Sequence, residues 1–392
     1  MELELWWLLA IPLFFGLGWM AARIDQRNTG GSSGNLPDAY FRGLNFLLNE
    51  QHDKAIDAFI DVVKLDPETV ELHFALGNLF RRRGETDRAI RVHLNLAERT
   101  SLEPGQREHA LYELGQDYLK AGLLDRAEDA FNRLDGTRYA AAALRHRLEI
   151  AEMVRDWPAA IALAARLRAD DGTPLVGGIA HFHCELAAKA LATQSPQRFE
   201  DALRELEAAL QIDPADARAL LMKGELMLAD GEPRAAIQAW RGLLAHHPAH
   251  LSLVAPAWLE SYRQVGEFEQ GIEALVDVQR RHPSADVFAA ILDAKLAHEG
   301  AESALRWGAE ELSRQPSVLG LDRWLHVRMQ PAGGTCADDE LTRRAIQSQV
   351  RRLGRYVCGH CGFKARQFYW HCPGCGHWDS YPPKRSEELE RG

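Results

Sequence analysis

The chain has 392 residues, a formal net charge of −10 and an isoelectric point of about 5.9. This length is sufficient for a large buried core or for an extended solenoid. The acidic balance argues against a general nucleic-acid binder and against a general binder of anionic lipids.

The first predicted element is an apolar helix at the amino end. Residues 5–22 (LWWLLAIPLFFGLGWMAA) carry no charge, and as a helix they would span about 27 Å, close to the apolar thickness of a bilayer. Tryptophans stand near both ends of this run, where indole rings favour the membrane interface. Glu2 and Glu4 precede it and Arg23 and Arg27 follow it, so the positive-inside rule places the amino end outside and the remainder inside. We predict a single transmembrane anchor over residues 1–24.

A cleaved signal peptide is the alternative for this segment. Met20-Ala21-Ala22 resembles a cleavage site only weakly, and no basic residue precedes the apolar run, whose length also exceeds that of a usual signal sequence. The glycines and the proline inside the run are common in membrane helices and indicate no particular partner. We therefore favour the anchor. A flexible linker follows over residues 25–35, rich in glycine and serine.

Between residues 36 and 330 the chain repeats itself. Gly43 and Gly77 are 34 residues apart, as are Ala55 and Ala89. Several units end in Asp-Pro or His-Pro, and proline stops a helix and disfavours helical geometry in its predecessor. The pattern resembles the tetratricopeptide repeat, a helix-turn-helix unit that buries its apolar face only by stacking. This resemblance implies an all-α, right-handed solenoid of about eight to nine repeats, and we expect an interruption near residues 171–178.

The repeats contain no recognisable catalytic motif. Within residues 36–330, neither a phosphate-binding glycine loop nor HExxH nor GxSxG occurs, so we predict no catalytic residue and no enzyme. His181, His183 and Cys184 form a cluster that could bind a metal, but neighbouring helical positions point in different directions, and packing roles are favoured. The arginine run 81–83, before Gly84, is interpreted as a solvated helix end.

Residues 331–355 are predicted to contain a loop and a connecting helix. This helix is basic on several faces, because it and its end carry Arg343, Arg344, Arg351, Arg352 and Arg355. We interpret it as a solvated helix opposite acidic repeat surfaces. A specific partner site is the alternative.

The most specific motif is a cysteine quartet near the carboxyl end, made of Cys358, Cys361, Cys372 and Cys375. Two CxxC pairs about a dozen residues apart have the spacing of a tetrahedral metal site with four thiolates. A glycine follows each pair, where a metal knuckle often requires positive φ. Four sulfurs leave no open coordination position, so we predict a closed structural site that accepts iron or zinc.

The module around this quartet, residues 356–382, is too small to build a sufficient apolar core. Metal coordination is therefore expected to supply most of its folding energy, on the order of 10 kcal/mol in comparable zinc peptides. Its aromatic side chains exceed what a small ribbon can bury: Phe363, Phe368, Tyr369, Trp370 and Trp378. We predict that several of these five pack on repeat helices. His360, His371 and His377 are weaker candidate ligands, because four thiolates suffice.

Two further cysteines lie outside the quartet, and a short segment follows the module. Cys184 and Cys336 are predicted to be unpaired thiols, which fits a reducing compartment better than an oxidising one. Residues 383–392 are predicted to form a polar tail.

The whole arrangement resembles the lipopolysaccharide assembly protein B family of Gram-negative bacteria, whose ribbon is rubredoxin-like. The motif from Tyr356 to Trp378 carries the resemblance most specifically. The resemblance implies an inner-membrane adaptor with a periplasmic amino end and a cytoplasmic bulk. It also implies that the four cysteines hold one iron or zinc ion, with iron favoured. The implied partners are the protease FtsH, its substrate LpxC, a membrane partner of the LapC/YejM type and other lipopolysaccharide assembly proteins; a homodimer stays open.

Two other functions remain as alternatives. The first is a general tetratricopeptide-repeat scaffold or chaperone for envelope enzymes. The second is a rubredoxin-type redox protein, because sulfur-ligated iron can carry one electron. No flavin or nicotinamide motif supports the redox alternative.

Overall fold

The computed structural model describes residues 19–20, 38–65, 69–167, 176–329 and 337–390. These residues are helical except for loops and one two-stranded sheet. The predicted anchor and linker lie outside the described residues, apart from Trp19 and Met20. Among the described residues, the helices are either too short or too polar to cross a membrane.

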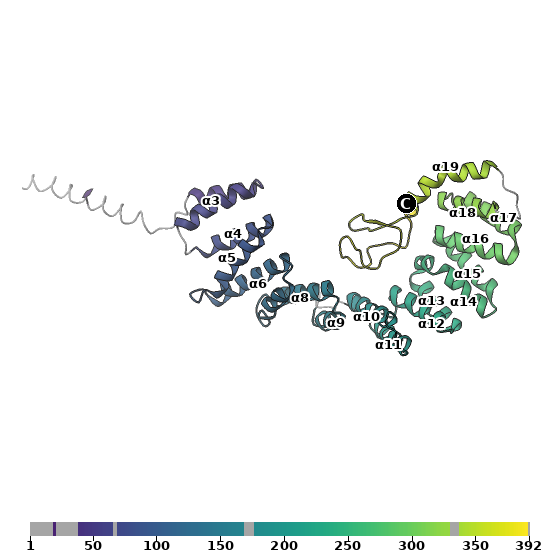
Figure 1. Cartoon of the computed structure of the whole chain (residues 1–392), viewed down its shortest axis with the longest axis horizontal. Coiled ribbons are helices and arrows are strands. Elements are labelled where there is room, and N and C mark those ends of the chain that lie inside the picture. Colours follow the sequence, from purple (N-terminus) through teal and green to yellow (C-terminus); the bar gives the residue numbers. More distant parts are fainter. Residues whose placement is uncertain (1–18, 21–37, 66–68, 168–175, 330–336, 391–392) are drawn as a thin grey trace, which may run out of the picture. The chain divides into compact units, whose positions relative to one another are not determined.

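Most helices pair with their neighbour in sequence, as the tetratricopeptide pattern predicts (Figure 1). The pairs are α2 (Asp38–Leu48) with α3 (His52–Leu65), α4 (Val70–Arg83) with α5 (Thr86–Glu98), α6 (Pro104–Lys120) with α7 (Leu124–Asn132), α10 (Val176–Leu191) with α11 (Arg198–Ile212), α12 (Ala217–Ala229) with α13 (Pro233–His246), α14 (Ala255–Gln264) with α15 (Phe268–Arg281), α16 (Ala285–Glu299) with α17 (Ala301–Arg314), and α18 (Val318–Arg328) with α19 (Ala337–Leu353). The remaining elements are α8 (Ala140–Val154), α9 (Trp157–Arg166), the 3-10 helix η1 (Pro248–Leu253), β1 (Tyr356–Val357), β2 (Lys364–Ala365) and α20 (Ser386–Leu389).

The chain divides into two compact units, Met1–Ile150 and Ala151–Gly392. This division precedes the interruption expected near residues 171–178. Residues 171–175 of that segment lie outside the described residues, and α10 already begins at Val176.

Close helix approach explains the repeated glycines. A Cβ atom added to Gly115 in α6 would lie 2.6 Å from a ring carbon of Phe131, which is fully buried. Only glycine leaves room for a ring at this depth, because well-packed interiors tolerate little extra volume. The same pairing of a glycine with a ring recurs in other repeats: Gly43 with Phe59, Gly77 with His93, Gly224 with Trp240, and Gly308 with Trp324.

Prolines end the second helices where the sequence predicts. α11 ends at Ile212 before Asp213-Pro214, and α13 and α15 end immediately before His247-Pro248 and His282-Pro283. These three boundaries are confirmed, whereas Asp66-Pro67 lies outside the described residues.

The arginine run before Gly84 differs from its interpretation as a solvated helix end. Arg81 is partly buried and donates to Asp117 at 2.9 Å and to Glu113 at 2.5 Å, one repeat later. Asp117 is fully buried and also contacts His93 Nδ1 at 2.5 Å. The interpretation is therefore wrong for Arg81, because two acidic side chains of the next repeat face it and offset the cost of its burial.

The ionisation of Glu113 makes the stability of unit Met1–Ile150 depend on pH. Burial alone would raise the pKa of its carboxyl, but hydrogen bonds from His109 and Arg81 and the charge of Arg81 outweigh burial and lower the pKa to about 2. A depressed pKa contributes stability above the unfolded value of 4.5, and this contribution is lost as the pH falls from there toward 2. We expect Glu113→Gln to destabilise unit Met1–Ile150 by about 3 kcal/mol at pH 7 and by much less near pH 2.

Denaturant unfolding at several pH values, followed by hydrogen exchange of α6, measures this difference. Asp129→Asn is the matched control, because Asp129 is an exposed carboxylate on the neighbouring helix α7. A destabilisation by Glu113→Gln that stays constant from pH 7 to pH 2 would contradict the assignment of the pKa shift.

Candidate metal centre and its docking surface

The carboxyl-terminal module consists of two short hairpin turns, each carrying one CxxC pair. β1 and β2 pair antiparallel, with Tyr356 opposite Ala365, and a bridge joins His371 to Trp378. The two turns have the same backbone geometry. Gly362 and Gly376 have φ of 77° and 69°, and each donates its N–H at 2.9 Å to the carbonyl of the first cysteine of its pair. Positive φ at both glycines confirms the predicted knuckle geometry.

The four sulfurs fit one tetrahedral ion. All four Sγ atoms lie within 4.8 Å of one another. Cys358 Sγ and Cys375 Sγ are 3.8 Å apart, and Cys361 Sγ and Cys372 Sγ are 3.7 Å apart. A tetrahedron with metal–sulfur bonds of about 2.3 Å requires sulfur–sulfur separations of about 3.8 Å. The cluster therefore has the size that a single sulfur-ligated ion needs.

Hydrogen-bond donors favour the thiolate form at Cys358 and Cys372. The Cys361 N–H points to Cys358 Sγ at 3.5 Å and the Gly374 N–H to Cys372 Sγ at 3.4 Å. Burial would raise the pKa of Cys358, but the Ser380 hydroxyl and backbone N–H groups outweigh it and lower the pKa to about 5. Such amide donors are the usual outer contacts of metal-bound sulfur.

The centre is closed on one side only. Cys358 and Cys372 are buried, whereas Cys361 is exposed. Tyr381, at 2 % exposure, covers the buried side and donates its hydroxyl to the Phe363 carbonyl at 3.2 Å. The opposite edge faces solvent.

Trp378 anchors the module to the repeats. Its indole stacks on His181 of α10 with centroids 4.9 Å apart, and it meets the rings of Phe182 and Trp157 edge-on. The indole N–H donates to Glu152 Oε2 at 3.2 Å. A large aromatic surface and a satisfied polar atom together make this contact strong.

Asp379 reinforces the anchor. Its carboxylate contacts His181 Nε2 at 2.6 Å, although its backbone has a positive φ of 49°. The expectation that His181 only packs within the repeats is therefore incomplete, because this histidine binds the module. His183 instead contacts Glu205 at 2.8 Å, and Cys184 is fully buried, as expected for packing residues.

A second aromatic contact lies further along the repeats. Trp370 stacks on His250 of η1 with centroids 5.5 Å apart and rings nearly parallel, at 6°. Burial, with His247 nearby, lowers the pKa of His250 to about 4, so the imidazole is neutral at pH 7. Phe368 also meets the His250 ring edge-on, with centroids 6.3 Å apart. The prediction that aromatic side chains of the module pack on the repeats is thus confirmed for Trp378, Trp370 and Phe368.

Phe363 is the exception among these aromatic residues. It is 44 % exposed and lies over Gly374 within the module. This side chain is not among those that pack on the repeats, because it projects on the solvent-facing edge of the ribbon. Tyr369 packs inside the module against Tyr381.

The residues expected to form a polar tail are docked over 383–390. Arg385 makes two hydrogen bonds to the Asp286 carboxylate, at 2.8 and 2.9 Å, and donates to the Gly354 carbonyl at 2.8 Å. Its guanidinium also lies 4.0 Å from the ring centroid of Tyr356. A planar cation with five donors suits such a junction.

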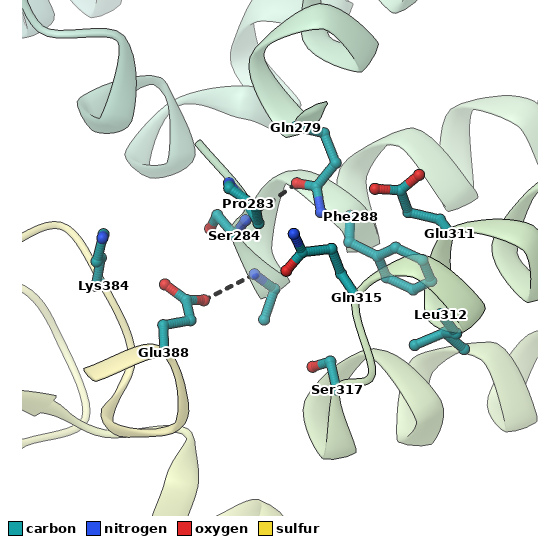
Figure 2. A pocket seen from close by; sticks show the side chains of 11 residues that line it. Gln279, Pro283, Ser284, Phe288, Glu311, Leu312, Gln315, Ser317, Lys384 and Glu388 are labelled. Carbon is teal, nitrogen blue, oxygen red and sulfur yellow. Dashed lines mark hydrogen bonds between the residues drawn. The ribbon is translucent and has the colours of Figure 1, made fainter. Parts of the chain in front are cut away.

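Two successive glutamates then cap two repeat helices. Glu387 accepts from the N–H groups of Val318 and Leu319 at the start of α18, at 2.6 and 3.1 Å. Glu388 accepts from the Ala285 N–H at the start of α16, at 2.8 Å, beside a pocket of about 210 Å³ (Figure 2). The first N–H groups of a helix lack internal partners, so both side chains satisfy otherwise unpaired donors and stabilise the docked end. Burial nevertheless raises the pKa of Glu388 to about 7.

The basic helix α19 fits the prediction of a solvated helix opposite acidic repeat surfaces. Arg343 binds Asp322 of α18 at 3.0 Å, whereas Arg351 and Arg352 are exposed. The expected opposition to acidic repeat surfaces is therefore confirmed at Arg343.

A groove of about 740 Å³ separates the module from the repeat helices. Within unit Ala151–Gly392, Figure 1 shows the module inside the arc that α10–α18 form. Leu221, Met222 and Glu225 of α12 line one wall, and Phe368 and Trp370 line the other. Glu225 is exposed to the groove, and the low polarity of its surroundings raises the pKa of its carboxyl. The groove therefore combines apolar side chains with charged ones, which also include Arg218, Asp293 and Arg366.

Comparisons with known protein families match both the ribbon and the repeats. A family model of the rubredoxin metal binding domain matches residues 356–382, and tetratricopeptide-repeat models match residues 42–101 and 195–258. The crystal structure of yeast Tom70 aligns over 80% of this chain and 84% of its own with 10% identity and a TM-score of 0.36.

Two curated relatives match along nearly their whole length. Lipopolysaccharide assembly protein B of Escherichia coli K12 is 36% identical over 387 residues, covering 98% of each chain. The protein of the same name from Haemophilus influenzae is 27% identical over 396 residues, covering 97% of this chain and 98% of its own. Full-length identity at this level, together with the repeats and the ribbon, shows that the chain belongs to the lipopolysaccharide assembly protein B family.

Proposed function

We propose that this protein is a non-enzymatic adaptor in lipopolysaccharide assembly. Membership of the family supports this role, and the docked module on the repeats is the single structural observation that carries it. The module, the groove and the concave helices form one composite surface that binds proteins rather than performs bond chemistry.

The proposed action is to promote FtsH-dependent proteolysis of LpxC at the inner membrane. Residues 1–24 would hold the protein there as a single transmembrane helix with the amino end in the periplasm and the repeats in the cytoplasm. An adaptor that presents LpxC to a membrane protease raises the local concentration of the substrate, which increases the rate without a catalytic group. A LapC/YejM-type membrane protein would restrain this action.

The proposed metal role is structural. Cys358, Cys361, Cys372 and Cys375 would hold one iron or zinc ion, and the sulfur–sulfur distances of 3.7 and 3.8 Å support this ligand set. The bound ion would keep the two knuckles together, so that Trp370 and Trp378 project from one rigid body onto the helices.

Measurement of LpxC in cells that lack the endogenous adaptor tests the proposal. The full chain is expected to lower the LpxC level, and a chain lacking residues 1–27 is expected to leave it high. FtsH depletion is the control, because it should abolish the effect of the full chain. Equal LpxC levels with and without residues 1–27, at equal expression, would contradict the anchored adaptor.

Two further measurements, of envelope-enzyme recovery and of metal replacement, separate the alternatives. A general scaffold for envelope enzymes would change the recovery of those enzymes while LpxC turnover stays constant. A redox protein would require iron specifically, so replacement by zinc would abolish its activity, whereas the adaptor is expected to function with either ion.

A further inference from the structure

A second cluster of metal-binding side chains lies on the solvent-facing edge of the ribbon. The donor atoms of His360, Cys375 and His377 all lie within 4.8 Å of one another. Both histidines are exposed, and their rings stack with centroids 3.5 Å apart. His360 belongs to the first knuckle and His377 to the second, so the same fold that gathers the four sulfurs brings these imidazoles together.

The hydrogen bonds leave an imidazole nitrogen of His377 available to bind a metal ion. His377 Nδ1 lies 3.2 Å from the Cys375 carbonyl, which fixes the proton on Nδ1 and leaves the lone pair on Nε2. A metal-binding histidine usually donates its other N–H to a carbonyl in this way. His371 differs, because its Nε2 contacts the Gly376 carbonyl at 3.0 Å and its ring stacks on Trp378.

The chemistry of the sulfur permits a shared ligand. A thiolate bound to one ion keeps lone pairs that can bind another, and four thiolates around a divalent ion leave an excess negative charge of two. We propose that Cys375 Sγ bridges to a second divalent transition-metal ion held by His360 and His377. Two nitrogens and one sulfur suit zinc or cobalt, and the fourth position of a tetrahedral ion remains for water.

The geometry requires only small movements. Sulfur and nitrogen ligands of a tetrahedral zinc ion are about 3.5 Å apart, so exposed rings within 4.8 Å need to move by about 1 Å and splay from their stack. This second site rests on the proposed occupation of the four-cysteine centre, since Cys375 is shared.

The test is equilibrium dialysis of the detergent-extracted full chain against micromolar zinc, with total iron and zinc counted per chain. Two equivalents are expected for the natural sequence and one for the double variant His360→Ala/His377→Ala, which should bind the second ion more than about 100-fold more weakly. His371→Ala is the matched control and should keep two equivalents.

Cobalt provides a signature of the bridging sulfur. Co²⁺ added to the protein with its first site filled should produce a sulfur-to-cobalt charge-transfer band that the double variant lacks. One equivalent in the natural sequence, or two in the double variant, would overturn the second site alone. Zero equivalents would overturn the four-cysteine centre and the second site with it.

Discussion

Replacing Cys358 and Cys372 together by serine is expected to empty the metal centre and to release the ribbon from the repeats. These are the two buried cysteines of the quartet, and each belongs to a different knuckle. Metal binding supplies on the order of 10 kcal/mol in comparable peptides, and few apolar contacts inside the module could replace it. We therefore expect loss of the module's order, not a modest decrease in stability.

Loss of order should extend to the repeat helices that the module caps. Without the ribbon, Glu387 no longer has a fixed position at the start of α18, nor Glu388 at the start of α16. Hydrogen exchange should therefore accelerate in residues 356–390 and in the first turns of both helices, while α4–α7 in the other unit stay protected.

Metal analysis and hydrogen exchange together measure this effect. Metal content should fall from one equivalent to near zero under conditions that fill only the first site. Cys184→Ala is the control, since Cys184 is buried in α10 away from the quartet and should leave the metal in place. A metal-free variant with full protection of residues 356–390 would show that packing alone orders the module.

The sequence predicts the local parts of this protein well, because each depends on residues close together in the chain. The CxxC spacing with its glycines indicates the knuckles, and the glycine period indicates where helices pack closely. Docking is different, because it joins residues about two hundred positions apart. Trp378 reaches Glu152, and His181 reaches Asp379, and no spacing in a single sequence relates such positions.

Charged residues mislead for a related physical reason. Arg81 would favour solvent if no opposite charge faced it, but Glu113 and Asp117 of the next repeat do face it. The composition of residues 383–392 predicts a polar tail. Its glutamates nevertheless accept hydrogen bonds from unpaired helix N–H groups, which no side-chain pattern reveals. One feature of the sequence does indicate docking. Residues 356–382 contain more aromatic side chains than the module can bury, so they require an apolar surface elsewhere.

Replacing Trp378 by alanine is expected to undock the ribbon while the metal stays bound. The indole contacts His181, Phe182 and Trp157, and its loss leaves a cavity against α10 and the Glu152 carboxylate without this donor. Removal of a packed aromatic side chain costs about 3 kcal/mol or more, which is a large share of what holds a small module on a surface. The sulfur cluster lies within the module and does not depend on this side chain.

The combination of retained metal and lost docking distinguishes this variant from the cysteine double variant. Metal content should remain at one equivalent, whereas hydrogen exchange should accelerate in α10 and in residues 376–390. Phe363→Ala is the matched control, because Phe363 is an exposed aromatic residue of the same module without a repeat contact. Unchanged protection in Trp378→Ala would place the docking energy in Arg385 and Trp370, and metal loss would mean that the knuckles need the repeats to form. If LpxC turnover also fails in this metal-bound but undocked variant, the adaptor surface is the docked composite and not the ribbon or the repeats alone.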